Sequence, residues 1–386
     1  MSKKLHVAFL WHQHQPYYRL PHSNTLTQPW VRLHGLKDYL DMPLRLEEFP
    51  RIHQTFNLVP SLLEQLDSYA GNKVTDPFLE LSRKRASMLE DEDKLELLKT
   101  HFSGNVKTMI APFPRYFSLH RRISSRTFEE SLSRLQESDY RDIQVWFNLA
   151  WLDPMFRDVD DVPRSLVQKG EDFSEEDKQR LFDYEDSILR RIIPTHKDLQ
   201  EQGLIEVSTT PFFHPILPLL CDFRSALESE PHAVLPSVEF RHPEDALAQI
   251  QMGIELYRSY FGRPPLGMWP SEGSVSPQAV RLIADAGINW IATDEEILSL
   301  SLKKPFRRDS NGLLESPTLL YRPYLLDDTQ GRLTCIFRDH TLSDLVGFQY
   351  YHMEPKKAAK DLVQRLENIH DQGLTDEHLV SIVLDG

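Results

Sequence analysis

Short apolar runs that stop at polar residues recur along this chain and alternate with amphipathic segments. The clearest unit begins with the apolar run at residues 267–270, after which Ser276 and Pro277 supply a helix N-cap and a first-turn proline. Residues 279–286 then have helical periodicity, and the next apolar run, at 288–293, follows a glycine. This alternation predicts parallel strands joined by helices.

Five further apolar runs bring the number of expected strands to about seven. They lie at residues 5–10, 53–58, 204–209, 333–337 and 380–384. The clearest further helices are expected at 243–260 and 355–372, each of which opens with a proline. A sheet of this size either closes into a barrel or stays doubly wound, and polar residues directly after the strands favour an α/β barrel.

Between about residues 68 and 200 the pattern becomes charged and helix-periodic. Two long helical segments are expected at 77–102 and 174–202, and Ser174 with Asp177 resembles a capping box at the start of the second. Pro194 is expected to kink or end that helix. We interpret 68–200 as a mostly helical insertion in a single barrel domain that spans residues 1–386.

Composition narrows the classes of function. The formal charge of −14 argues against a nucleic-acid partner and an anionic membrane surface, whereas neutral sugars face no such penalty. The chain has no apolar run of the roughly 18 residues that a membrane span needs. It also lacks a phosphate loop, a dinucleotide glycine fingerprint and a Gly-X-Ser-X-Gly elbow. The two cysteines, Cys221 and Cys335, are expected to be buried thiols, so we predict a cytoplasmic protein.

Two acids follow apolar runs, at the carboxyl ends of expected strands, where α/β-barrel enzymes have their catalytic residues. Glu272 stands where the run at 267–270 enters a turn, and Asp385 ends the run at 381–384. A pair of carboxylates is what cleavage of a glycosidic bond requires. Considered singly, each acid could instead be a helix cap or a surface residue.

Histidines follow other expected strands. His12 and His14 would share one face of an extended segment, which suits either a hydroxyl-binding floor or half of a metal site; the alternative is a polar surface turn. Glu206 lies in the run at 204–209, and Phe212, Phe213 and His214 follow it. The phenylalanines could form an apolar platform for a sugar ring, or they could be core, with Glu206 a solvated or salt-bridged strand residue.

Three more residues could line a polar pocket. Asp294 follows the run at 288–293, although Thr293-Asp294 is also a good helix start. His340 follows the run at 333–337, beside an arginine and an aspartate. Trp30 could wall the pocket or pack against the first helix.

With these motifs assembled, the chain resembles glycoside hydrolase family 57. Residues 12–16, 203–218, 269–272 and 383–386 resemble the first four signature motifs of that family, in order. The resemblance implies a (β/α)7 barrel, which is an incomplete TIM-like barrel, and a retaining enzyme that forms a covalent glycosyl-enzyme intermediate. It assigns the nucleophile to Glu272 and the general acid/base to Asp385. The other residues expected to contact substrate are His12, His14, Gln15, Trp30, Glu206, His214, Trp269, Asp294 and His340.

The resemblance also implies the partners of the protein. It implies an α-glucan or malto-oligosaccharide substrate, an activity of the amylase, pullulanase, branching-enzyme or 4-α-glucanotransferase type, and neither a cofactor nor a catalytic metal. Family members continue beyond the fourth motif into a helical region, so we expect this chain to be a fragment of such an enzyme. Two alternatives stay open. One is a metal-dependent deacetylase or mannosidase with His12, His14 and an acid as ligands, and the other is a glucan-binding pseudoenzyme.

Overall fold

The computed structural model describes residues 4–125, 127–326 and 333–386, and the chain divides into two compact units. The first unit comprises residues 1–16, 50–63 and 199–386, and the second comprises 17–49 and 64–198. The helical insertion that we predicted at 68–200 therefore corresponds to the later part of the second unit, which also takes in 17–49.

The first unit is built on seven parallel strands in the order β3-β2-β1-β8-β7-β5-β4. All seven strands predicted from the sequence are present, and one short antiparallel strand, β6, is added beside β7. Their bounds are β1 (His6–Gln13), β2 (Gln54–Leu58), β3 (Ile205–Ser208), β4 (Gly267–Met268), β5 (Trp290–Asp294), β6 (Tyr324–Leu325), β7 (Thr334–Arg338) and β8 (Leu379–Asp385).

The two outer strands of this order meet and close the sheet. Thr209, directly after β3, forms a parallel bridge with Met268 of β4. The Trp269 N–H donates to the Thr209 carbonyl at 3.0 Å, and the Thr209 N–H donates to the Gly267 carbonyl at 3.2 Å. The predicted (β/α)7 barrel is thereby confirmed.

The packing inside the barrel explains why His12 and Asp385 lie above the apolar core, at the carboxyl ends of their strands. Leu10, Ala292 and Val383 pack with Trp269 in one buried cluster inside the ring of strands. Because side chains alternate across a strand, residues two positions further on share that inward face one layer higher. His12 and Asp385 are in this higher layer, where they are paired in the β1–β8 register.

A glycine makes room for the indole of Trp290 low in the barrel. A Cβ atom added to Gly267 would lie 1.9 Å from Cε2 of Trp290. Only a hydrogen fits there, so the close approach explains why β4 begins with glycine.

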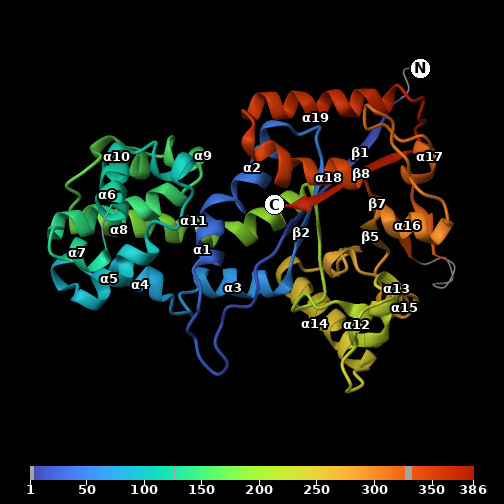
Figure 1. Ribbon diagram of the computed structural model, residues 1–386, viewed down its shortest axis with the longest axis horizontal. Helices are drawn as coiled ribbons and strands as arrows, with labels where there is room; N and C mark the ends of the chain where they lie inside the picture. The colour runs from blue at the N-terminus through green and yellow to red at the C-terminus, as the bar shows by residue number, and fades with distance from the viewer. Residues whose placement is uncertain (1–3, 126, 327–332) are drawn as a thin grey trace. The chain divides into compact units, whose positions relative to one another are not determined.

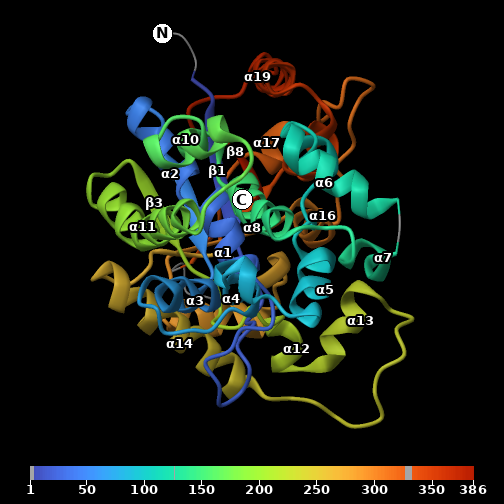
Figure 2. The ribbon, with the colours of Figure 1, turned by 90° about the vertical axis from the view of Figure 1, so that its left-hand side faces the viewer.

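Helices cover both sides of the strands of this unit. In Figure 1, α19 lies on one side of β1 and β8, and α12, α14 and α15 lie on the other; Figure 2 shows the same for α19, α12 and α14 from a second direction. The helices predicted at 279–286, 243–260 and 355–372 are α15, α14 and α19. The helices of this unit are α12 (Leu217–Cys221), α13 (Ala226–Ser229), α14 (Pro243–Phe261), α15 (Pro277–Asp285), α16 (Glu295–Leu302), α17 (Pro317–Leu320), α18 (His340–Asp344) and α19 (Pro355–His370).

The described part of the second unit contains helices but no strand. Helix α8 is buried along most of its length and packs against α1, α4 and α6 (Figure 2). The bounds are α1 (Trp30–Lys37), α2 (Asp41–Glu48), α4 (Pro77–Arg83), α5 (Asp91–Thr100), α6 (Pro114–Ser124), α7 (Phe128–Leu132), α8 (Glu137–Trp151), α9 (Pro154–Arg157) and α10 (Asp161–Lys169); α3 (Pro60–Ala70) and α11 (Glu175–Glu201) belong to both units.

Helix α11 tests two local predictions. Ser174 and Asp177 form the expected capping box, with N–H to side-chain oxygen distances of 2.9 and 3.0 Å. The helix continues through Pro194 to Glu201, so the prediction that the proline could end it is wrong. None of the helices in the described ranges combines the length and apolar content that crossing a membrane would need.

Candidate active site

Glu272 is presented by a strained turn directly after β4. It lies in the 3-10 turn η4 (Ser271–Gly273) with φ +56°, in the left-handed region that residues other than glycine seldom adopt. The turn is held in place because the Thr293 hydroxyl donates to the Gly273 carbonyl at 2.5 Å. The Trp269 indole packs against the same glycine. The carboxylate of Glu272 is thereby directed outward, with 69% of its side chain exposed.

Asp385 is the last residue of β8, beside His12 of β1. The Gly386 N–H donates to the His12 carbonyl at 3.0 Å, which continues the strand pairing past the acid. Partial desolvation raises the pKa of Asp385, although the charges of His14 and Arg338 oppose the rise. A raised pKa favours the protonated form, which a general acid needs.

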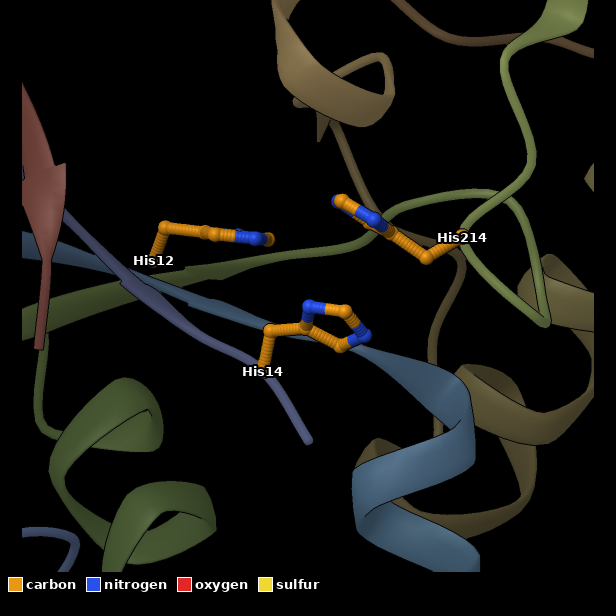
Figure 3. Close-up of side chains that lie close together, drawn as sticks. All are labelled: His12, His14 and His214. Atoms are coloured by element: carbon orange, nitrogen blue, oxygen red, sulfur yellow. The ribbon is translucent and has the colours of Figure 1, made fainter. Parts of the chain in front are cut away.

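Three histidines, His12, His14 and His214, lie close together near these strand ends (Figure 3). His12 and His14 come from β1 and the residues just after it, and His214 comes from the loop after β3, where its φ of +57° turns the chain. The ring centroids of His12 and His214 are 5.0 Å apart, and those of His14 and His214 are 4.1 Å apart. The remaining pair, His12 and His14, is separated by 5.6 Å.

Burial keeps these imidazoles uncharged at neutral pH. It is the main cause that lowers the pKa of His12 to about 4, against a hydrogen bond with Asn57. For His14 and His214, burial and then the neighbouring imidazoles lower the pKa to about 4 and about 3. Neutral imidazoles can accept as well as donate hydrogen bonds, which suits a surface that binds hydroxyl groups.

The histidine cluster connects the two acids. His14 interacts electrostatically with Asp385, and the Nδ1 atom of His214 lies 3.7 Å from Oε1 of Glu272. Because the rings of His14 and His214 are in contact, both acids border one set of imidazoles. The structure therefore brings together six of the residues selected from the sequence, because Trp269 also lies here, with its ring centroid 6.3 Å from that of His12.

A second polar cluster joins the ends of β5 and β7. Asp294 caps α16 through Oδ1, which accepts the Glu296 N–H at 2.9 Å. Its Oδ2 atom accepts Arg338 Nε at 2.6 Å and lies 3.1 Å from His340 Nδ1. The other ring nitrogen of His340 lies 3.0 Å from Oδ2 of Asp344. Asp294 is thus a helix cap, as the alternative from the sequence had it, and its role in a substrate pocket stays a prediction.

This cluster gives a pH-dependent prediction. Burial alone would lower the pKa of His340, but its bond to Asp294 and the charge of Asp344 raise it above the usual value near 6.5. Burial would raise the pKa of Asp294, but its hydrogen bonds lower it. We expect an NMR titration to give His340 an elevated pKa that falls in Asp294→Asn. The exposed Glu296→Gln, which removes a charge without touching these bonds, should change it much less.

The sign of the linked effect on stability follows from these directions. A raised histidine pKa contributes stability that is fully present below about 6.5 and is lost as the pH rises through the folded-state pKa. The lowered pKa of Asp294 contributes stability above about 3.9 that is lost as the pH falls. If the pKa of His340 is at or below that of a histidine in a model peptide, the interaction of His340 with Asp294 and Asp344 is contradicted.

Other predicted site residues are placed elsewhere. Glu206 lies early in β3, level with Thr55 and below Ser208, and its carboxylate accepts the Trp290 Nε1–H at 2.9 Å inside the barrel. The bond to the indole differs from the solvated or salt-bridged position that the sequence alternative described, and contact of Glu206 with substrate stays a prediction. Trp30 begins α1 in the second unit, where its ring packs near His34 and Trp151.

The two phenylalanines of the loop after β3 are in edge-to-face contact, with ring centroids 4.6 Å apart, but they differ in burial. Phe212 is buried, as in the core alternative, whereas Phe213 is 46% exposed. The Gln15 carbonyl accepts the hydroxyl of Ser61 at 3.3 Å, which ties the loop after β1 to the start of α3.

Sequence reasoning missed residues that orient the selected ones. Asn57, buried in β2, makes a 2.7 Å hydrogen bond to His12 Nδ1. A lone amide inside the apolar run at 56–58 was the available signal. Arg308 binds Glu295 with both ends of its guanidinium, at 2.5 and 2.6 Å, and Glu295 in turn accepts the His340 N–H.

The comparison with protein families decides the assignment. The family model "Glycosyl hydrolase family 57" matches residues 8–386, nearly the whole chain. The chain belongs to glycosyl hydrolase family 57. It shows local similarity to "Alpha-amylase 1" of Dictyoglomus thermophilum, at 29% identity over 28% of this chain and 13% of the relative. It is 30% identical to "1,4-alpha-glucan branching enzyme TK1436" of Thermococcus kodakarensis, over 26% of this chain and 12% of the relative.

Solved structures share the fold of this family member. The α-amylase AmyC of Thermotoga maritima superposes with a TM-score of 0.53 at 13% identity, over all of this chain and 67% of that one. The branching enzyme TK1436, solved in complex with glucose and additives, gives 0.52 at 16% identity, over all of this chain and 64% of that one. The chain thus spans about two thirds of the length of these structures, and the likeness concerns the fold.

Proposed function

We propose that this chain is the catalytic part of an enzyme that cleaves or transfers α-glucans with retention of configuration. Glu272 is the nucleophile and Asp385 is the general acid/base. His12, His14 and His214 bind hydroxyl groups of the sugar between the two acids. Trp269 supports the turn that carries Glu272, and Asp294 and His340 line the rim nearby.

The proposed reaction has two steps, formation of a glycosyl-enzyme and its transfer to water or to an acceptor sugar. In the first, the Glu272 carboxylate attacks the anomeric carbon, the bond to the leaving oxygen breaks, and the Asp385 carboxylic acid gives that oxygen its proton. In the second, the Asp385 carboxylate takes a proton from water or from an acceptor hydroxyl. The oxygen of that molecule attacks the anomeric carbon and displaces Glu272, so the product regains its original configuration.

The observation that carries the proposal is that one histidine cluster interacts with both acids, through a distance of 3.7 Å between His214 and Glu272 and an electrostatic interaction between His14 and Asp385. Glu272 and Asp385 come from strands that are not neighbours in the barrel, yet His214 faces one and His14 interacts with the other. Paired carboxylates across a hydrogen-bonding floor are what a retaining glycosidase needs. Partial desolvation raises the pKa of Asp385, which favours the protonated form that a general acid needs.

Family membership weighs against the metal-dependent deacetylase or mannosidase alternative. That alternative required His12, His14 and an acid as a ligand set, whereas the described residues group His12 and His14 with a third histidine.

The test is product stereochemistry on a defined substrate. The chain is incubated with maltoheptaose, and the configuration of the first product is followed by NMR before mutarotation. We expect α-anomers, with chromatography separating hydrolysis, which gives shorter chains, from transfer, which also gives longer ones. First-formed β-anomers would contradict retention, and binding without any conversion would favour the pseudoenzyme alternative.

A further inference from the structure

The three imidazoles that face one another after β1 and β3 have the geometry of a metal-ligand set. One potential ligand atom from each of His12, His14 and His214 lies within 4.8 Å of the other two. Figure 3 shows the rings directed toward a shared space. A tetrahedral zinc ion with Zn–N bonds of about 2.0–2.1 Å needs nitrogens roughly 3.4 Å apart. Side-chain shifts on the order of 1 Å therefore suffice to close the set around an ion.

Asn57 fixes the tautomer of one ligand. Its side-chain nitrogen donates to the Ser208 hydroxyl at 3.0 Å and to the Thr209 carbonyl at 2.7 Å, which identifies Oδ1 as its acceptor atom. The hydrogen bond of 2.7 Å between Oδ1 and His12 is therefore donated by Nδ1 of the imidazole. The lone pair of His12 is left on Nε2, and this is the outer-sphere arrangement that orients metal-binding histidines.

The burial of His214 is a second, independent observation that points to a bound ligand. Its side chain is 4% exposed, and its Nε2 atom is buried and has no hydrogen-bond partner among the described residues. A buried nitrogen without a partner is unfavourable, and coordination of an ion would satisfy it.

We propose that His12, His14 and His214 bind one divalent transition-metal ion of the zinc type, in a site that inhibits the enzyme. Three neutral histidines leave the fourth position of a tetrahedral ion open to water or a small anion. The ion would occupy the space in which we place the sugar hydroxyls, so zinc and glucan should compete. This inhibition rests on the proposed function, but the binding of the metal does not.

The test measures metal uptake directly. The chain is freed of metal with a chelator and titrated with Zn²⁺ by calorimetry, and with Co²⁺ by its visible absorption, which reports a four-coordinate site. We expect one ion per chain in the wild type. His14→Ala and His214→Ala should each weaken binding by at least about 100-fold, and Asn57→Ala, acting through His12, should weaken it by about 10–100-fold.

The matched control is His242→Ala, a surface histidine paired with Glu244 before α14. It should leave the affinity unchanged, and circular dichroism should show that each variant is folded. If His14→Ala does not fold, His14→Gln keeps the volume and the hydrogen bonding but loses the imidazole nitrogens. The proposal would be overturned if the wild type does not take up zinc, or if His14→Ala and His214→Ala bind zinc as tightly as the wild type.

A catalytic variant separates this proposal from the proposed function. Glu272→Gln should still take up one zinc ion per chain while it has no turnover. If the wild-type chain binds zinc but does not act on glucans, the proposed function is contradicted and the metal site is supported. Glucan turnover that is insensitive to zinc at concentrations that fill the site would overturn the inhibitory role.

Discussion

Glu272→Gln should reduce turnover of malto-oligosaccharides by on the order of 10³-fold or more, the scale of loss seen when a covalent nucleophile is removed. The amide has the shape of the carboxylate but cannot form a stable ester with the anomeric carbon. Because the Glu272 side chain is mostly exposed, the substitution should leave the fold intact. The measurement is kcat/KM from the release of reducing ends, with Glu255→Gln on the exposed face of α14 as the control.

A second variant at the same position makes the assignment specific. Glu272→Gly suits the left-handed φ of +56° and leaves room for a small anion. With added azide and a substrate that has a good leaving group, it should form a glycosyl azide of inverted configuration. Wild-type rates in Glu272→Gln, or an azide product of retained configuration from Glu272→Gly, would place the nucleophile elsewhere.

Asp385→Asn should affect substrates unequally. General acid catalysis typically contributes 10²–10⁴-fold, so cleavage of a glucan, whose leaving alcohol needs a proton, should fall by about that factor. An aryl glycoside with an acidic phenol needs little protonation, so formation of its glycosyl-enzyme should be nearly normal. The intermediate should then accumulate, because no base activates the water.

The measurement for this variant is a burst of phenol followed by a slow steady state. The control is Asp371→Asn, an acid at the end of α19 whose side chain is 82% exposed. An equal loss on glucans and on activated aryl glycosides would indicate that Asp385 positions the substrate and does not transfer a proton.

The strands of the barrel were predictable because each one is a short apolar run bounded by turn signals. Closure of the barrel was confirmed by a contact that no local pattern contains, the bridge between Thr209 and Met268. Strand β6 was missed since its two residues, Tyr324 and Leu325, are ordered by pairing with β7 and not by periodicity. Pro194 does not end α11, which matches the helical segment predicted at 174–202 and continues past the one hydrogen bond that the proline cannot make.

The candidate site was predictable to the extent that it follows from strand ends. His12 and Asp385 could be selected because they end apolar runs, and strand pairing makes them neighbours. The position of His214 depends on a loop with positive φ, which composition does not encode. Glu206 shows the converse: it has the right residue type in the right strand, but the register puts it one layer down, beside Trp290.

The pairing of β1 with β8 governs the order in which the protein can fold. Leu10 and Val383 are register partners although almost the whole chain separates them, so a ribosome that adds 5–20 residues per second needs roughly 20–75 s to supply the second after the first. During that interval one edge of β1 has no strand to pair with, and exposed edges of this kind recruit other chains. The helices of the second unit, all of which precede β8 in the chain, can form meanwhile. Nascent chains stalled before β8 should therefore depend on chaperones to keep an apolar strand from aggregating.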